Sequence, residues 1–202
     1  MDETIVIEKK SRKDSIIDFV QSVAIALAFS AFLFIFVITP NEVDGSSMLP
    51  NYHSGDRLYT NKLTHWFNGT DLGSTLGLNY NRGDVVVVDK PGLGLSLIKR
   101  IVGLPGEKIM VSEGKVYING RQINENYLPE DTETIGATFL QNNKELTIPE
   151  NNYFVMGDNR KVSNDSRYIG FINKDWISGK IFLRIWPIDK VGVINSGEFT
   201  FK

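Results

Sequence analysis

The stretch that decides the fold lies at residues 81–89 and reads NRGDVVVVD. The turn residues Asn81-Arg82-Gly83 precede a compact run, Asp84–Asp89, in which four valines follow one another. Valine is β-branched and favours extended backbone, whereas asparagine and glycine favour turns. The stretch therefore predicts a short β-strand introduced by a turn.

Similar patterns continue towards the C-terminus. Asn119-Gly120 between two apolar runs is a strong signal of a type I′ hairpin. Further strands are predicted at Leu97–Val102, Lys115–Ile118, Arg121–Ile123, Tyr153–Met156 and Ile181–Trp186. No segment of convincing length with helical periodicity follows Thr39. Residues 40–202 are expected to form a mainly β domain, a folded barrel or sandwich of short strands, in which 68–81 and 124–143 are loops or a small subdomain.

The N-terminal part of the chain has a different character. Residues 15–39 are predominantly apolar, and Ser22 to Thr39 gives 18 residues without a charge. As an α-helix this segment spans roughly 27 Å, close to the hydrocarbon thickness of a bilayer. We therefore predict a transmembrane anchor helix over 15–39. A cleavable signal peptide and a buried core helix are alternatives, but the segment is long for the first and lacks the polar stripe of the second.

Basic residues predict the orientation of this anchor. Lys9, Lys10, Arg12 and Lys13 precede it, and the next Lys or Arg is Arg57. Flanking segments rich in Lys and Arg stay in the cytoplasm. Residues 1–14 are thus expected to be a cytoplasmic tail, and residues 40–202 an extracytoplasmic domain of a single-pass plasma-membrane protein.

Composition narrows the classes of function. The 202 residues carry a net charge of −2 and no long basic stripe, so nucleic acid is not an expected partner. The absence of cysteine excludes thiol catalysis, thiolate zinc sites and disulfides. Only His53 and His65 are present, which argues against a multi-histidine metal site.

Three clusters have the residue types that catalysis needs, and the first is Gly45-Ser46-Ser47-Met48-Leu49-Pro50. Small residues let a substrate backbone approach closely. A serine in such a turn can act as a nucleophile, with neighbouring N–H groups available to an oxyanion. By itself such a cluster is more often an ordinary loop.

The second cluster runs from Ile98 to Glu107 and places Lys99 in an apolar strand. Alternation puts Lys99 on one face with Leu97 and Ile101, and Arg100 on the other. A free lysine has a pKa of about 10.4, and burial lowers it because the charged form is disfavoured. A neutral lysine can then accept a proton from serine. The alternative is an edge strand whose Lys99 and Arg100 are solvated.

The third cluster, Gly157 to Arg167, reads GDNRKVSNDSR and is dense in hydrogen-bonding side chains. Arg167 is expected to pair with Asp165 or Asp158 through charge-assisted hydrogen bonds. Ser163 or Ser166 is placed to orient a catalytic group. Such clusters usually buttress a loop, and some support an active site.

In this order, behind an N-terminal anchor, the three clusters resemble the characteristic boxes of bacterial type I signal peptidases. Ser47 to Pro50 matches Ser-Met-x-Pro, and Lys99 to Glu107 matches Lys-Arg-x-x-Gly-x-Pro-Gly-[Asp/Glu]. Gly157 to Arg167 matches Gly-Asp-Asn-Arg-x-x-Ser-x-Asp-Ser-Arg at every fixed position, and Asp84–Asp89 matches another box. The chain departs from the family at Gly45, where some members carry serine, and at Asn51, where threonine is common.

The resemblance implies a role for each matching residue. Ser47 would be the nucleophile and Lys99 the general base, while the Ser47 backbone N–H would donate to the oxyanion. Ser163 would hold the lysine amine by a hydrogen bond. The supporting and substrate-binding positions are Asp165 and Arg167 as an ion pair, Asp158 and Arg160 as braces of the same loop, and Val43, Met48, Leu97 and Ile98 as pocket lining.

The resemblance also implies a substrate and partners. A serine endopeptidase of this kind removes signal peptides from exported preproteins after small residues, typically Ala-x-Ala. Its partners would be those signal peptides, the lipid bilayer and, indirectly, the Sec/Tat export machinery. No metal or organic cofactor is implied.

Other functions compete with this interpretation. A serine–histidine–acid protease would use His53 or His65, but neither has an acid partner in a recognisable motif. A self-cleaving repressor protease would need a DNA-binding region where this chain has an apolar segment. A conjugation-type export protease and a non-catalytic anchored β domain are the remaining alternatives.

Overall fold

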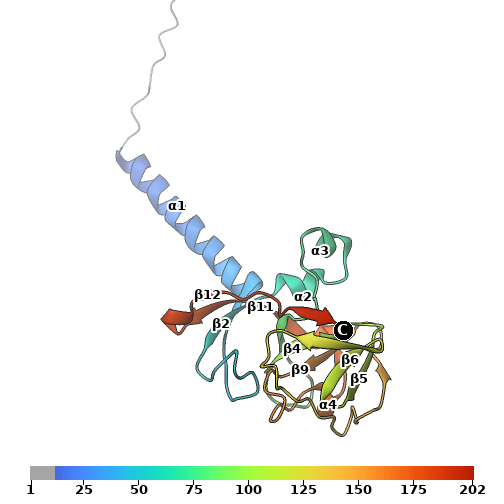
Figure 1. The fold of residues 1–202 in the computed structure, drawn as a ribbon. Coiled ribbons are helices and arrows are strands. Elements are labelled where there is room, and N and C mark those ends of the chain that lie inside the picture. The colour runs from blue at the N-terminus through green and yellow to red at the C-terminus, as the bar shows by residue number, and fades with distance from the viewer. Residues whose placement is uncertain (1–11) are drawn as a thin grey trace, which may run out of the picture. The chain divides into compact units, whose positions relative to one another are not determined.

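The computed structural model describes residues 12–202. The chain divides into two compact units, one that ends at Val37 and one that runs from Ile38 to Lys202. The first contains the long helix α1, and the second contains the strands and the short helices (Figure 1). The predicted cytoplasmic tail lies outside the described residues except for residues 12–14.

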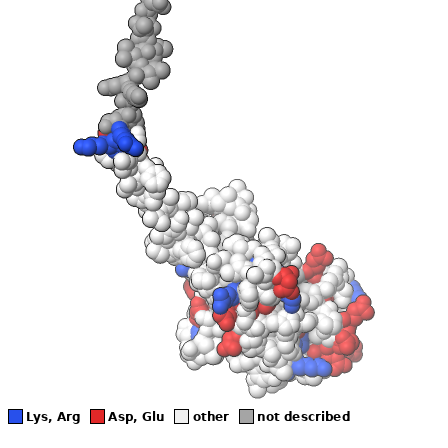
Figure 2. Space-filling model, turned by 90° about the vertical axis from the view of Figure 1, so that its left-hand side faces the viewer, with Lys and Arg blue, Asp and Glu red and all other residues white. Residues whose placement is uncertain are grey.

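Helix α1 spans Arg12–Phe32 and continues as a π-helical turn, η1, over Leu33–Val37. Neither segment has a buried residue, and in Figure 2 the basic side chains of the helix gather at its start. Among the described residues it is the one helix long and apolar enough to cross a membrane, as a membrane anchor requires. Helical structure ends two residues before the predicted limit of 39, because Ile38 and Thr39 pair with Asn61 and Thr60 in a sheet.

The larger sheet of the second unit is antiparallel, with strand order β1-β2-β11-β3-β4-β9-β10 and β12 on β11. Its strands are β1 Ile38–Glu42, β2 Arg57–Asn61, β3 Val85–Val88, β4 Leu97–Gly103, β9 Asn152–Met156, β10 Ile172–Asn173, β11 Ile177–Trp186 and β12 Gly192–Val193. Strand β4 lies between β3 and β9, in the interior of the sheet. The predicted strands therefore form, with β11 beginning earlier than expected.

A second antiparallel sheet has the order β13-β7-β6-β5-β8. Its strands are β5 Lys108–Ser112, β6 Lys115–Ile118, β7 Arg121–Glu125, β8 Leu146–Thr147 and β13 Phe199–Phe201. Asn119 and Gly120 join β6 to β7 with φ angles of 52° and 76°. Positive φ at both central positions is the requirement of a type I′ turn, so the predicted hairpin is confirmed.

Helical structure in this unit is limited to short pieces. They are α2 Leu63–Phe67, α3 Asp71–Thr75, α4 Ser166–Ile169, η2 Lys174–Trp176 and η3 Ile188–Lys190. Residues 68–81, predicted as a loop or small subdomain, contain α3. Residues 124–143 are irregular after the end of β7. The described fold is thus mainly β, as predicted.

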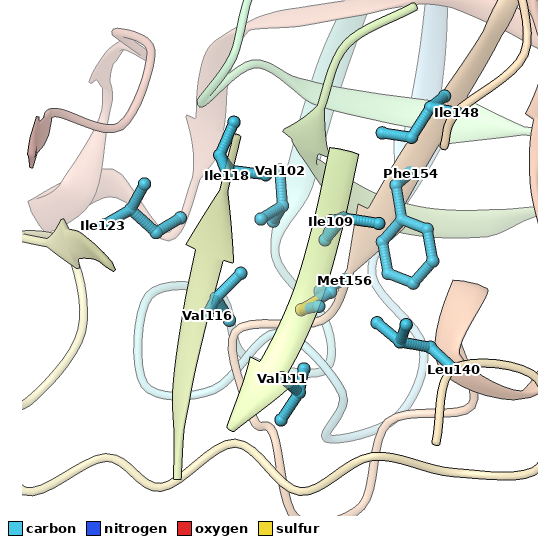
Figure 3. Packing of buried hydrophobic residues seen from close by; sticks show 10 residues of the cluster. All are labelled: Val102, Ile109, Val111, Val116, Ile118, Ile123, Leu140, Ile148, Phe154 and Met156. Atoms are coloured by element: carbon cyan, nitrogen blue, oxygen red, sulfur yellow. The ribbon is translucent and has the colours of Figure 1, made fainter. Parts of the chain in front are cut away.

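The four valines of the opening stretch are buried on both faces of the sheet. Val85 and Val87 pack into one apolar cluster with Met48, whereas Val86 and Val88 pack into another. A continuous apolar run is typical of a strand covered on both faces. A third cluster joins β4 and β9 to the second sheet and is shown in Figure 3, where Val102, Phe154 and Met156 face residues of β5 and β6.

Candidate active site

Ser47 lies in the loop that connects β1 to β2. Its neighbour Met48 is buried with 1% of its surface exposed, and the carbonyl of Met48 accepts a hydrogen bond from the backbone of Tyr52 at 3.0 Å. Gly45, on the other side, has a φ of 91°, a conformation that favours glycine. The loop is therefore anchored through Met48 while Ser47 itself stays partly exposed.

Lys99 reaches Ser47 from the interior strand β4. Only 3% of its surface is exposed, and its Nζ atom lies 2.8 Å from Ser47 Oγ. The same amine donates to the carbonyl of Ile98 at 2.9 Å. The alternative of a solvated edge strand is wrong, because β4 has neighbours on both sides and both Lys99 and Arg100 are buried.

The environment of Lys99 favours its neutral form. Burial lowers the pKa of this amine from 10.5 to about 8, while the carboxylates of Asp165 and Asp158 act in the opposite direction. Desolvation dominates because the charged form loses its hydration. Close to neutral pH a much larger fraction of this amine is therefore neutral than of a free lysine, and the neutral form is the one that can act as a general base for a serine hydroxyl.

The loop after β9 brings the third cluster against Ser47. The backbone N–H of Asn159 donates to the carbonyl of Ser47 at 2.9 Å, and its side-chain amide donates to the carbonyl of Ser46 at 3.1 Å. The approach is close because Gly157 lacks a side chain: a Cβ there would lie 2.4 Å from the Ser47 carbonyl oxygen and 2.3 Å from Ser163 Oγ. Sequence reasoning did not single out Asn159 and gave Gly157 no such role, although both lie within the quoted motif.

Asp165 and Arg167 form a buried ion pair. Two guanidinium nitrogens of Arg167 donate to the two carboxylate oxygens of Asp165, each at 2.8 Å. Asp165 also accepts the backbone N–H of Gly157 at 3.0 Å, and it caps the N-terminus of α4. This carboxylate therefore ties the loop to the strand that precedes it.

Asp158 pairs with Arg100 rather than with Arg167. The guanidinium of Arg100 donates to both Asp158 oxygens at 2.9 and 2.7 Å, and Asn51 adds a hydrogen bond at 2.8 Å. Asn51, where threonine is common in the family it resembles, thus links the chain after Pro50 to this buried pair. Arg160 instead pairs with Glu125 at 2.6 and 2.5 Å and donates to the carbonyl of Gly157 at 3.0 Å.

Ser163 is buried, but the structure does not form the hydrogen bond expected between it and Lys99. Ser163 Oγ has no hydrogen-bond partner within the described residues, since the amine of Lys99 is directed at Ser47 and the carbonyl of Ile98. Ser166 is not directed at the lysine either, because its Oγ accepts the backbone N–H of Val155 at 3.0 Å. Ser166 therefore buttresses β9.

Comparison with known proteins assigns this arrangement to a family. A family model described as signal peptidase, peptidase S26, matches residues 16–186. The chain belongs to this family. It is 32% identical to a signal peptidase I of Bacillus licheniformis over 91% of this chain and 97% of that one. It is 31% identical to signal peptidase IB of Staphylococcus aureus, over 88% of this chain and 93% of that one.

A crystal structure of a signal peptidase I from Enterococcus faecalis is also similar. It shares 32% identity, with a TM-score of 0.43 over 50% of this chain and 96% of that chain. Family membership identifies the protein as a peptidase of the signal peptidase family, and the apolar helix α1 fits a membrane anchor of such an enzyme.

The four residues predicted to bind substrate do not form one group. Val43, Met48 and Ile98 belong to the same apolar cluster beside the Ser47 loop. Leu97 packs into a different cluster. Val43 and Met48 are buried, whereas Leu97 and Ile98 are half-buried. Their role in substrate binding stays a prediction.

The two histidines have other surroundings than a serine–histidine–acid protease requires. His65 is in α2 with its Nδ1 2.6 Å from the carbonyl oxygen of Ile177, and His53 is exposed. Neither hydrogen-bonds to Ser47 in the part of the chain that the structure describes. Over the same residues, 12–202, no group of three or more His, Cys, Asp or Glu side chains could hold a metal ion.

Proposed function

We propose that this protein is a signal peptidase I that removes signal peptides from exported preproteins, with Ser47 as nucleophile and Lys99 as general base. The observation that carries the proposal is the 2.8 Å contact between the buried Lys99 Nζ and Ser47 Oγ. A nucleophile and a base within hydrogen-bond reach are the signature of covalent catalysis. The name of its relatives, signal peptidase I, supplies the substrate class.

Acylation follows from this geometry. The neutral amine of Lys99 accepts the proton of the Ser47 hydroxyl as Oγ attacks the scissile carbonyl carbon. The oxyanion of the tetrahedral intermediate accepts a hydrogen bond from the backbone N–H of Ser47, which donates to no acceptor in the described residues. Lys99, now an ammonium, gives its proton to the leaving amine as the peptide bond breaks.

Deacylation reuses the same residues. Lys99 is neutral again and accepts a proton from a water molecule, whose oxygen attacks the ester carbonyl. The resulting tetrahedral intermediate collapses, and the proton passes from Lys99 back to Ser47 Oγ. The signal peptide leaves with a new carboxylic acid, which releases its proton to water, and both catalytic groups return to their starting states.

The substrate would bind extended beside the Ser47 loop. Small residues at the first and third positions before the cut, in the pattern Ala-x-Ala, would bind near Val43, Met48, Leu97 and Ile98. A signal peptide spans the bilayer like α1, and Ser47 follows Val37 by only ten residues, so the cut falls near the membrane surface. The Lys and Arg residues at positions 9–13 favour an N-terminus in the cytoplasm, so the catalytic unit would lie outside it.

Cleavage of a preprotein by purified full-length protein in detergent tests the proposal. Wild type should cut after an Ala-x-Ala site, whereas Ser47→Ala and Lys99→Ala should lose at least about a thousandfold in rate, as removal of members of a catalytic unit does elsewhere. Circular dichroism should show that all three proteins are folded. A His53→Ala variant serves as the control and should cut like wild type.

Two results would contradict the proposal. Cleavage that survives in folded Lys99→Ala would refute lysine as the base. Folded wild type that cuts none of several precursors would refute the function itself.

A further inference from the structure

The segment between β2 and β3 is unusual in its surface chemistry. Residues 63–81 include α2 and α3, and Asp71 is the only Asp, Glu, Lys or Arg among them, whereas 23% of the whole chain is charged. Exposed protein surface ordinarily carries many charges of both signs. This segment, called here the α2–α3 hairpin, projects from the sheets in Figure 1.

Large apolar side chains are exposed on the α2–α3 hairpin. Trp66 is 50% exposed, Leu72 51% and Leu76 59%. Leu72 and Leu76 are four residues apart, a spacing that places them on one side of a helical turn. A projection with three large apolar side chains and a single charge is unsuited to water and suited to an apolar neighbour.

The exposure does not reflect a loosely attached loop. Asn68 accepts the backbone N–H of Tyr80 at 2.9 Å and donates to the hydroxyl of Tyr153 at 3.0 Å. Close packing within the hairpin requires Gly73, because a Cβ there would lie 1.9 Å from the carbonyl oxygen of Phe67. The fold therefore holds the hairpin in place and still leaves its apolar side chains uncovered.

Connectivity places the hairpin near the point where the anchor enters the catalytic unit. Ile38, bonded directly to the last residue of η1, is the sheet partner of Asn61, and α2 begins two residues after Asn61. From ordinary backbone dimensions, the Cα of Trp66 lies no more than about 18 Å from that of Ile38. Strand β2 runs antiparallel to β1, so the chain travels back towards Ile38 as it approaches the hairpin.

We infer that the α2–α3 hairpin is a second membrane contact, whose Trp66, Leu72 and Leu76 enter the interface of the bilayer that α1 crosses. The inference rests on the membrane anchoring proposed above. A bilayer fits better than a protein partner because the anchor already holds a lipid surface near this end of β1. Tryptophan is enriched at the interface because its ring combines an apolar body with a polar N–H.

Single-cysteine variants test this directly, because the chain contains no cysteine of its own. Leu72→Cys and Leu76→Cys would carry an environment-sensitive fluorophore on the full-length protein in phosphatidylethanolamine–phosphatidylglycerol vesicles. Ile25→Cys, in the middle of α1, is the positive control, and Lys144→Cys, on an exposed turn before β8, is the negative control. Far-UV circular dichroism checks that each labelled protein is folded.

Labels at 72 and 76 are expected to emit at shorter wavelength and to be quenched by lipids with a nitroxide in the headgroup region, whereas the label at 144 is not. If labels 72 and 76 behave like 144 while the label at 25 is quenched, the inference is wrong. Protection from aqueous iodide without quenching by nitroxide lipid would also overturn it, in favour of a protein neighbour. A label at 25 that is not quenched would refute the anchor and the inference together.

Cleavage of a precursor is scored separately in the same vesicles with the unlabelled wild type. Protein that cuts while labels 72 and 76 stay in water refutes the membrane contact alone. Protein whose labels are quenched but which cuts no precursor refutes the proposed function alone.

Discussion

The side-chain amide of Asn159 donates to the carbonyl oxygen of Ser46 at 3.1 Å, and this carbonyl belongs to the same peptide unit as the N–H of Ser47. In a planar trans peptide the C=O and N–H groups point in opposite directions. Fixing the Ser46 oxygen therefore fixes the direction of the Ser47 N–H, the donor proposed for the oxyanion. The hydrogen bond also polarises the peptide unit and strengthens that donor. Asn159 is a positioning residue in this arrangement.

Asn159→Ala should lower kcat by about tenfold, less than the hundredfold or more that follows removal of an oxyanion donor itself. KM should change little, because Asn159 makes no proposed contact with substrate. The pH at which kcat/KM rises should not change, since the Asn159 side chain is neutral and does not touch Lys99. Steady-state kinetics checks all three expectations, with Asn124→Ala, at an exposed position of β7, as the matched control. An unchanged kcat would contradict the role of Asn159.

The rate should depend on pH through Lys99. Its pKa is lowered to about 8 by burial, and only the neutral amine accepts a proton. Consequently kcat/KM should rise with pH and level off above an apparent pKa of about 8. A pH profile with a short peptide substrate in detergent measures this. A rate that is flat between pH 6 and pH 9 would be incompatible with lysine as the base.

Asp165→Asn should shift the rise of kcat/KM with pH to lower pH. The Asp165 carboxylate raises the pKa of Lys99, whereas burial lowers it. Without the carboxylate the pKa of Lys99 should therefore fall further.

Asp165→Asn also leaves the buried guanidinium of Arg167 without its partner, which should destabilise the fold by about 3–5 kcal/mol. Denaturant unfolding in detergent measures the second effect. Glu42→Gln, which breaks a pair of exposed side chains 3.9 Å apart, should cost less than about 1 kcal/mol.

Lys99→Met should stabilise the protein while it abolishes cleavage. Lys99 has a pKa of about 8 in the folded protein and an ordinary value of 10.5 in the unfolded chain, so between these two pH values the unfolded chain binds more protons. Wild-type stability should therefore rise with pH across this window and stay at its lower level below about pH 8. The variant lacks this dependence and should gain up to about 3 kcal/mol at neutral pH. Unfolding midpoints of both proteins at pH 7 and pH 10 test this prediction. A variant less stable than wild type at pH 7 would show that burying the Lys99 amine does not destabilise the fold.

Gly157→Ala should impair both folding and catalysis. Its Cβ would meet the Ser47 carbonyl oxygen and Ser163 Oγ at distances that require one of them to move. Because Asn159 binds the same carbonyl, the Ser47 loop should shift away from Lys99. Gly192→Ala is the matched control, since a Cβ there meets nothing within 4 Å. Equal activity and thermal stability of the two variants would show that the approach at Gly157 is not tight.

Local patterns in the sequence predicted much of this protein. The valine run, the type I′ turn at Asn119-Gly120 and the apolar α1 depend on neighbours along the chain, so each is visible without a structure. The residues at which these elements end were less predictable. The helix ends at Val37 because Ile38 pairs with Asn61, and no local pattern reveals that pairing. The pairing of Ser47 with Lys99 was expected only from the resemblance of the motifs to a known family, since each motif by itself had a simpler explanation.

Only the tertiary structure decided how the charged and polar groups pair. Asp158 binds Arg100 and not Arg167, and Arg160 binds Glu125, which sequence reasoning left in an unassigned loop. These choices depend on strand order and register, which bring together residues 58 and 35 positions apart. The burial that lowers the pKa of Lys99 has the same origin, because a lysine in an apolar strand is solvated at an edge and desolvated between β3 and β9. The sequence determined which groups were present, and the packing of the sheets determined which of them meet and in what protonation state.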